Sequence, residues 1–328
     1  IIKKLPFSLT ASQEKVLAEI NKDLSSKKRM FRIIQGDVGS GKTIISLLAI
    51  SNIIESGYQC ALMGPTEILA KQHFELAKKI YKEVNFNIDF LTGKTDLRDR
   101  KKILINLENG KTNLLIGTHA LFQKKINFNK LGLIVIDEQH KFGVKQRSEL
   151  AKKGGDNCDV LLMSATPIPR TMMMSLYGDM DISKITEKPA KRQKIITLSK
   201  PEKKINDLWP FIRKQLINKN QIFWVCPLIE ESKFLDYSSA KKKFDLISKK
   251  FPNKVGLIHG ALDKNEKEEV LNKFLNKNLS ILVSTTVIEV GIDFPNANLI
   301  IIENANKFGL AQLHQLRGRV GRGDKQGT

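Results

Sequence analysis

Cysteine is scarce in this chain of 328 residues. The three cysteines, Cys60, Cys158 and Cys226, lie far apart, and no two of them have the spacing of a zinc site or a disulfide framework. This pattern predicts reduced thiols in a cytoplasmic protein, with Cys60 and Cys226 buried in strands. The sequence also lacks an apolar run long enough to span a bilayer, and residues 1–10 lack the features of a signal peptide. No membrane partner is therefore expected.

Acidic residues are fewer than basic residues in this chain. The chain has 55 lysines and arginines against 34 aspartates and glutamates, which gives a formal net charge of +21. An excess of this size is typical of a protein that binds a polyanion, most often nucleic acid, although a lysine-rich chain can also be merely well solvated. Charge alone does not distinguish DNA from RNA or from an acidic membrane surface.

Short apolar runs alternate with longer amphipathic segments along the chain. Near-continuous apolar strands separated by helices indicate a parallel sheet that is covered on both faces. A charged, proline-containing stretch at 186–204 interrupts the pattern and predicts a linker between two α/β domains, at about 1–190 and 191–328. The expected strands are 31–36, 59–64, 113–118, 133–138, 160–165, 221–226, 254–260, 280–285 and 298–304, and the expected helices include 43–56, 66–83 and 95–109.

The stretch GDVGSGKT (36–43) follows an expected strand and precedes an expected helix, which is the context that a phosphate-binding P-loop requires. Glycines let the backbone curl so that its N–H groups face phosphate oxygens, and the helix N-terminus adds partial positive charge. Lys42 can reach the β- and γ-phosphates, and the Thr43 hydroxyl can bind Mg²⁺. The predicted nucleotide-binding residues of this loop are Gly36, Asp37, Val38, Gly39, Ser40, Gly41, Lys42 and Thr43.

The stretch LIVIDEQH (133–140) places two carboxylates at the end of an expected buried strand, where open parallel sheets bind their ligands. Asp137 is expected to hold Mg²⁺, and Glu138 to orient and deprotonate the attacking water. Two adjacent acids are often only a solvated turn, but the P-loop upstream favours the catalytic interpretation. Gln139 and His140 could sense the γ-phosphate, while His140 has no histidine or cysteine nearby at metal-ligand spacing.

An ordered set of motifs resembles that of superfamily 2 DNA helicases and extends over nearly the whole chain. The motifs are GDVGSGKT, GPTEILAKQH (64–73), GTHALF (117–122), DEQH (137–140), SATPIPRT (164–171), STTVIEVGID (284–293) and QLRGRVGR (315–322). Within the superfamily, the segments at 5–20, 221–232 and 257–274 resemble the RecG family, ATP-dependent translocases that remodel branched DNA, such as stalled forks and Holliday junctions, in recombination and repair. The Mfd family of transcription-coupled repair is the runner-up, because it shares GDVGSGKT and SATPIPRT but lacks a segment like CPLIEES.

The resemblance implies two RecA-like P-loop domains, each a mostly parallel sheet with helices on both faces, with nucleotide bound in the cleft between them. Arg319 and Arg322 match the two arginines of the last helicase motif and would stabilise charge on the transferred phosphoryl group, a role that can be worth about 10³ to 10⁵ in rate. Gln315 would orient these arginines. Gly291 and Asp293 would couple the nucleotide state to closure of the domains.

The resemblance also assigns residues to adenine and to DNA. Gln13 would bind adenine and Phe7 would stack on it, although Phe7 could instead pack against the helix that starts near Thr10. Ser164 and Thr166 would take part in coupling. The implied contacts to the DNA backbone, which fix register without reading sequence, are Pro65, Thr66, Gln72, Thr118, His119, Thr285 and Thr286. Polar residues also cap helices at such places.

RecG-like proteins carry an amino-terminal wedge domain, which is expected to be missing before Ile1, and the second domain is expected to be truncated after the motif at 315–322. The protein is expected to act as a monomer. A catalytically silent nucleic-acid-binding module and a P-loop kinase or transporter ATPase are the alternatives from other classes. The intact set Lys42, Asp137, Glu138, Arg319 and Arg322 argues against the first. The separate arginine domain and SATPIPRT argue against the second.

Overall fold

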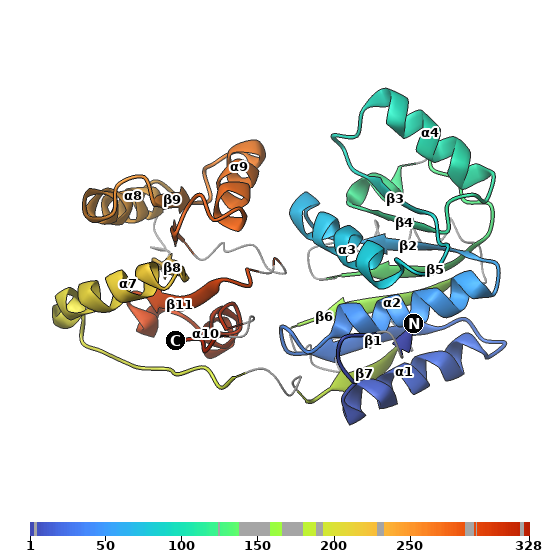
Figure 1. Cartoon of the computed structure of the whole chain (residues 1–328), viewed down its shortest axis with the longest axis horizontal. Coiled ribbons are helices and arrows are strands. Elements are labelled where there is room, and N and C mark those ends of the chain that lie inside the picture. The colour runs from blue at the N-terminus through green and yellow to red at the C-terminus, as the bar shows by residue number, and fades with distance from the viewer. Residues whose placement is uncertain are drawn as a thin grey trace. The chain divides into compact units, whose positions relative to one another are not determined.

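A computed structural model of the chain describes residues 1–2, 5–123, 125–137, 158–165, 180–187, 193–227, 233–285, 292, 294–321 and 325–328. The chain divides into two compact units, Ile1–Pro189 and Ala190–Thr328 (Figure 1). Each unit is built on its own sheet, and each is described by itself below.

The first unit contains a seven-stranded sheet in the order β3-β4-β2-β5-β6-β1-β7, in which every pairing is parallel. The strands are β1 (Phe31–Gly36), β2 (Gln59–Met63), β3 (Ile88–Leu91), β4 (Leu114–Gly117), β5 (Leu131–Ile136), β6 (Asp159–Ser164) and β7 (Asp181–Ile185). The helices described are α1 (Ala11–Leu24), α2 (Lys42–Glu55), α3 (Glu67–Ile80), α4 (Leu97–Glu108) and the short 3₁₀ helix η2 (His119–Phe122).

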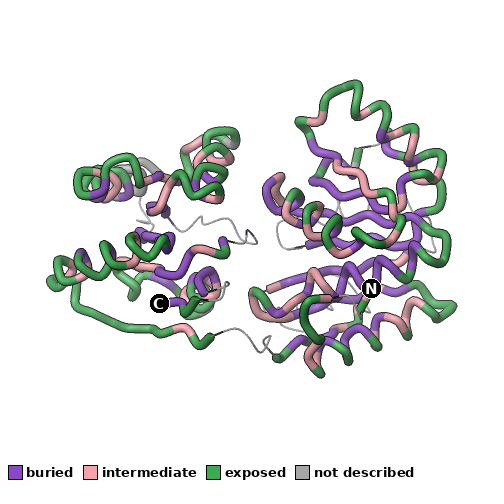
Figure 2. Tube along the Cα trace, viewed as in Figure 1, coloured by how far each residue is buried: buried purple, intermediate pink, exposed green. Residues whose placement is uncertain are grey.

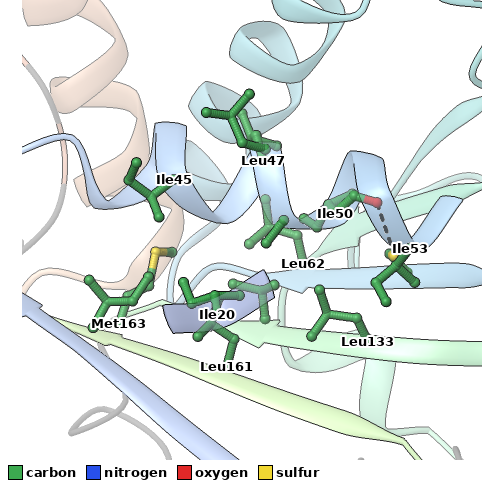
Figure 3. Close-up of a cluster of buried hydrophobic side chains, with 14 of the residues drawn as sticks. Ile20, Ile45, Leu47, Ile50, Ile53, Leu62, Leu133, Leu161 and Met163 are labelled. Atoms are coloured by element: carbon green, nitrogen blue, oxygen red, sulfur yellow. Dashed lines mark hydrogen bonds between the residues drawn. The ribbon is translucent and has the colours of Figure 1, made fainter. Parts of the chain in front are cut away.

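Two hydrophobic clusters lie on opposite faces of this sheet. Leu133 and Val135 of β5 belong to one cluster, and the alternate residues Ile134 and Ile136 belong to the other, as the two-residue period of a strand requires. Helices α1, α2 and α3 contribute to the first cluster and α4 to the second. Figure 3 shows part of the first cluster, where α2 packs over the strands, and Figure 2 shows the strands largely buried and the outer sides of the helices exposed. The expected sheet with helices on both faces is confirmed for this unit.

Two strands of the first unit, β3 and β7, were not expected from the sequence. They form the two edges of the sheet, and among the described residues each pairs with a single neighbouring strand. Their sequences, IDFL and DISKI, mix apolar and charged residues and are only partly buried. An edge strand is half solvated, so it does not need the continuous apolar run that marks a central strand of a parallel sheet.

Hydrogen bonds join the last described residues of the first unit to residues near its beginning. Strand β7 pairs with β1, with Ile185 opposite Gly36. Just after β7, Ser12 and Glu187 exchange hydrogen bonds: the Ser12 N–H donates to Glu187 Oε2 (3.0 Å), and the Glu187 N–H donates to Ser12 Oγ (3.3 Å). The hydrogen bond from the Ser12 backbone lowers the pKa of the Glu187 carboxyl. On the same edge, Arg32 Nε donates to Asp23 Oδ2 at 2.7 Å. Together, these bonds join α1, β1 and β7.

The second unit contains a four-stranded parallel sheet in the order β11-β8-β10-β9. The strands are β8 (Gln221–Val225), β9 (Val255–Ile258), β10 (Ile281–Ser284) and β11 (Ala297–Ile302). The helices described are α7 (Leu208–Ile217), α8 (Lys233–Lys250), α9 (Lys264–Leu275), α10 (Leu310–Arg317), η4 (Glu202–Asp207) and η5 (Ala305–Lys307).

Aromatic side chains cover both faces of this second sheet. On one face, Trp209 of α7 stacks on Trp224 of β8, with 5.6 Å between the ring centroids. On the other, Phe223 of β8 packs against Phe274 of α9 and against Phe294, at 5.3 Å in each case. Neighbouring residues of β8 thus face opposite ways, so the second sheet is also covered on both sides, as expected.

The last residues of the chain lie along β11. The Thr328 N–H donates to the Asn298 carbonyl (2.8 Å), and the Ile300 N–H donates to the Thr328 carbonyl (2.9 Å), which is the pattern of a parallel pairing. The Ile196 N–H in turn donates to the Gly327 carbonyl (2.9 Å). Part of the stretch that was expected to be a linker therefore pairs with the second unit.

All three cysteines are buried and free. Cys60 lies in β2 and Cys226 directly follows β8, close to what the sequence predicts. Within the described part of the chain, no helix is both long enough and apolar enough to cross a membrane.

Candidate functional site

The predicted P-loop lies between the end of β1 and the start of α2. Gly39 and Gly41 have left-handed backbone angles, with φ of +79° and +88°, a region that glycine adopts without steric cost. Gly41 is also the N-cap of α2, and a Cβ atom at this position would lie 2.3 Å from Gln13 Nε2. The curled, glycine-dependent backbone that the motif predicts is therefore present.

The side chain of Lys42 folds back into this loop. Its Nζ donates to the carbonyl oxygens of Gly36 (2.7 Å) and Asp37 (3.1 Å), and the residue is buried. A turn bond from the Ser40 N–H to the Asp37 carbonyl (3.0 Å) closes the loop. The ammonium group thus lies inside the curl of the backbone, beside the N-terminus of α2, where positive charge and exposed N–H groups attract an anion.

Gln13 joins the first helix to the P-loop. Its Oε1 accepts a hydrogen bond from the Thr10 N–H (2.9 Å) in the capping box of α1, and its Nε2 donates to the Ser40 carbonyl (2.7 Å). An amide side chain has two donor and two acceptor positions, so one of each is used in these two bonds. Phe7 is 43% exposed, and Thr10 is the N-cap of α1. The adenine contacts of Gln13 and Phe7 stay predictions.

Three strand ends meet at one edge of the first sheet. Strands β5, β6 and β1 are consecutive neighbours and parallel, so Asp137, Ser164 and Gly36 lie at the same carboxyl edge. Neighbouring strands are about 4.8 Å apart, which puts the ends of β5 and β1 about 10 Å apart. Asp137 is buried and follows Leu133 and Val135 at two-residue spacing. It therefore continues the face that α2 and α3 cover.

An unexpected residue contacts Asp137. His73, in α3, places its Nε2 2.9 Å from Asp137 Oδ2. Sequence reasoning passed over this histidine, although it ends the motif GPTEILAKQH. The available signal was a histidine at the spacing of the buried residues Leu69, Ala70 and Ala77 on an otherwise apolar helix face, since a buried imidazole needs a hydrogen-bond partner.

The residues at this edge fit Mg²⁺. Mg²⁺ takes oxygen ligands and is held by one or two carboxylates together with phosphates and waters, rather than by an all-protein cage. Asp137 supplies a carboxylate at the end of β5, and Thr43 supplies a hydroxyl in the first turn of α2. Among the residues that the structure describes, no group of three or more histidine, cysteine, aspartate or glutamate side chains forms a metal cage.

Several predicted site residues lie outside the described residues. They are Glu138, Gln139, His140, Thr166, Thr286, Gly291, Asp293 and Arg322. The general base, the γ-phosphate sensors and the second arginine therefore stay predictions.

Arg319 lies in the second unit, just after α10. This helix ends at Arg317 with Gly318 as its C-cap, and the Arg319 N–H donates to the Leu316 carbonyl (3.0 Å). Arg319 is only 2% exposed, whereas Arg317 is exposed and Gln315 is partly buried.

The chain turns at Gly321, where φ is +65°. A Cβ atom there would lie 2.9 Å from the Gly327 nitrogen. A close approach of the backbone thus requires this glycine.

The predicted DNA contacts differ in accessibility. Pro65, Thr66 and Gln72 are partly buried and His119 is exposed, but Thr118 and Thr285 are almost fully buried. Thr66 is the N-cap of α3, where its side chain accepts a hydrogen bond from the Leu69 N–H (3.3 Å). The accessible candidates for a phosphate contact are therefore those around the start of α3 and His119.

Comparison with known proteins identifies the family. A DEAD/DEAH box helicase model matches residues 10–175, which is about half of the chain. The chain belongs to the DEAD/DEAH box helicase family. A helicase conserved C-terminal domain model matches residues 203–324.

Curated helicases and solved structures place this family member more closely. The ATP-dependent DNA helicase RecG of Thermotoga maritima is 48% identical over 99% of this chain, and that of Bacillus subtilis is 47% identical over 99%. The solved structure of RecG bound to a three-way DNA junction is 44% identical, with a TM-score of 0.86 over 98% of this chain. The DEAD-box helicase Mss116, solved with single-stranded RNA and UDP-BeF, is 21% identical with a TM-score of 0.72 over 99% of this chain and 70% of its own, and shares the fold.

These comparisons confirm the resemblance to RecG and the two RecA-like domains of the helicase fold. The chain spans 42% of the Thermotoga maritima protein, 48% of the Bacillus subtilis protein and 42% of the RecG chain solved with DNA. It therefore corresponds to less than half the length of these relatives.

Proposed function

We propose that this chain is an ATP-driven DNA motor that remodels branched DNA in recombination and repair. The observation that carries the proposal is the arrangement at one edge of the first sheet, where the Lys42 loop follows β1 and the buried Asp137 carboxylate follows β5, two parallel strands on either side of β6. A phosphate-binding loop and a carboxylate in this arrangement suit Mg²⁺–ATP. The similarity to RecG over nearly the whole chain supports the link from ATP to DNA.

The chemistry follows from the groups available. Phosphoryl transfer depends mainly on positioning and on stabilising charge. Lys42 would bind the β- and γ-phosphates, while Thr43 and Asp137 would hold Mg²⁺. Glu138 would activate water. Arg319 and Arg322 would stabilise the charge that develops on the γ-phosphate, because a guanidinium is permanently charged and can donate two parallel hydrogen bonds to phosphate.

The proposed partner is branched duplex DNA, bound through its backbone and without sequence specificity. A net charge of +21 favours a polyanion, and the RecG relative of known structure is bound to a three-way DNA junction. The accessible residues Pro65, Thr66, Gln72 and His119 would contact phosphates, and Thr286 would contribute from the second unit, whereas Thr285 is buried. We propose a monomeric motor that acts in the cytoplasm.

The test is phosphate release from ATP by the purified chain, with Mg²⁺, in the presence and absence of forked and linear DNA. We expect hydrolysis that DNA stimulates. Lys42→Ala should abolish hydrolysis and leave DNA binding largely intact, because Lys42 lies within the nucleotide loop. Lys15→Ala, which removes an exposed lysine of α1, is the matched control and should behave like the original chain.

Two results would contradict the proposal. An unchanged rate of ATP hydrolysis in Lys42→Ala would show that residues 36–43 are not the phosphate-binding loop. Hydrolysis that no DNA stimulates, together with absent DNA binding, would show an ATPase of another kind.

A further inference from the structure

His73 is the only polar residue among the buried residues of α3, the helix Glu67–Ile80. It is 4% exposed. Placing an imidazole in such an environment is costly unless its nitrogens are hydrogen-bonded, and the Nε2 atom meets this requirement through Asp137 Oδ2 at 2.9 Å. An ionised carboxylate can only accept hydrogen bonds, so toward an ionised Asp137 the donor of this hydrogen bond is Nε2–H.

The packing of α3 brings the imidazole within reach of β5. Ala70 and Ala77 precede and follow His73 by three and four residues, on the same face of the helix, and both are fully buried. A Cβ atom on Gly64, just after β2, would lie 2.9 Å from the Ala70 nitrogen. Small residues therefore let this helix lie close to the end of β2, and the longer His73 side chain extends to the end of the neighbouring strand β5.

The segment from 63 to 73 thus holds Asp137 at two points. The Asp137 N–H donates to the Met63 carbonyl (2.9 Å), which fixes the backbone, since β2 and β5 are paired neighbours. His73 holds one carboxylate oxygen, which fixes the rotation of the carboxylate group. The same ten-residue motif that was assigned to DNA contacts through Pro65, Thr66 and Gln72 therefore also orients the carboxylate at the nucleotide site.

We propose that His73 is a positioning residue, which holds the Asp137 carboxylate in the orientation that Mg²⁺–ATP requires. The proposal rests on the proposed role of Asp137 toward Mg²⁺. Mg²⁺ demands near-ideal octahedral geometry, so a carboxylate that is free to rotate binds it less well. Loss of a hydrogen-bond partner behind a metal ligand typically costs about 10- to 100-fold in metal affinity or activity.

The test compares His73→Leu, which removes the donor, with His73→Gln, whose amide nitrogen can take the place of Nε2. Binding of a fluorescent ATP analogue is measured with Mg²⁺ and with EDTA, alongside the Mg²⁺ concentration that gives half-maximal hydrolysis. We expect His73→Leu to weaken Mg²⁺-dependent binding about 10- to 100-fold, to leave binding in EDTA unchanged, and to shift the Mg²⁺ requirement upward. His73→Gln should recover most of the loss.

Glu75→Leu, at an exposed position of α3, is the control for changes in the helix itself, and unfolding curves are recorded for each variant. If His73→Leu does not fold, His73→Asn serves in its place, because its shorter side chain stays polar but does not reach Asp137. A fall in melting temperature without a change in Mg²⁺-dependent binding would reduce His73 to a structural role and overturn the proposal.

Asp137→Asn separates this proposal from the proposed function. If Asp137→Asn loses Mg²⁺-dependent binding while His73→Leu keeps it, only the positioning role is wrong. If Asp137→Asn also binds Mg²⁺–nucleotide normally, the metal assignment of Asp137 is wrong and the role of His73 falls with it.

Discussion

Gly41→Ala should weaken nucleotide binding substantially, and the structure sets the size of the effect. Gly41 has φ of +88°, and holding an alanine in the left-handed region costs roughly 1–2 kcal/mol. The added Cβ atom would also lie 2.3 Å from Gln13 Nε2, so Gln13 must give up its bond to the Ser40 carbonyl, a further cost of about 1 kcal/mol.

The loop of the variant can escape this strain by leaving its curled conformation, and nucleotide binding must then restore that conformation. The combined cost of about 2–3 kcal/mol corresponds to roughly 30- to 150-fold weaker binding. The assay is titration of a fluorescent ATP analogue in the presence of Mg²⁺, with unfolding curves recorded in parallel.

Gly57→Ala is the matched control. Gly57 follows the other end of α2 with φ of +83°, and a Cβ atom there would meet nothing within 4 Å. This variant should lose stability from backbone strain alone and bind nucleotide normally. Adding Gln13→Ala to Gly41→Ala should cost less than the sum of the single changes, because the clash is then gone. Normal nucleotide binding by Gly41→Ala, or strict additivity of the two changes, would refute this reasoning.

Three further predictions follow from charge and burial. The DNA-binding constant should fall steeply as salt rises, with a log–log slope of about −0.9 for each duplex phosphate neutralised, and should vary little with base sequence. Arg319→Ala should leave ATP binding intact and slow hydrolysis by about 10³ or more, while the exposed Arg317→Ala should change neither. Burial raises the pKa of Cys158 and of Cys226 to about 12 and the pKa of Cys60 well above its usual value. Since the thiolate is the reactive form, the folded chain should react slowly with iodoacetamide at pH 8, faster as pH rises, and fastest when unfolded.

Each of these has a clear contrary result. A DNA-binding constant that does not change with salt, or that strongly favours one DNA sequence over its scramble, would exclude binding through electrostatic contacts to the DNA backbone. An unchanged rate of ATP hydrolysis in Arg319→Ala would show that this arginine does not take part in the reaction. Rapid alkylation of the folded chain at pH 8 would show that the thiols are reached through an opening that their burial does not reveal.

Local sequence patterns were sufficient for the central strands and for the curled, glycine-rich loop between β1 and α2. The run FRIIQG matches β1 at both ends, whereas LIVIDE was placed two residues too late for β5, because Leu131 and Gly132 precede the purely apolar run. The edge strands β3 and β7 were not predicted, because an edge strand that is partly exposed to solvent does not need a continuous run of apolar residues.

The contacts between distant residues could not be foreseen in the same way. His73 and Asp137 are 64 residues apart, and Gln13 and Ser40 are 27 apart. Motifs identified Gln13, Ser40 and Asp137 singly, but no spacing in the sequence encodes which residue bonds to which. Those pairings arise only when parallel strands bring their carboxyl ends to one edge and the helices pack over them.

The hydrogen bonds that hold β7 and Glu187 against the beginning of the first unit have a mechanical consequence. Strand β7 runs beside β1, the strand that leads into the nucleotide loop, and a Cβ atom on Gly36 would lie 3.2 Å from Ile185. Two residues further on, Glu187 is bonded to Ser12, next to Gln13. A pulling force on the chain after residue 187 would therefore be transmitted to β1 through its pairing with β7. It would also reach the start of α1 through the hydrogen bonds between Glu187 and Ser12. Both elements contact the glycine-rich loop. The polypeptide itself can act as a tether that transmits load to the proposed ATP site.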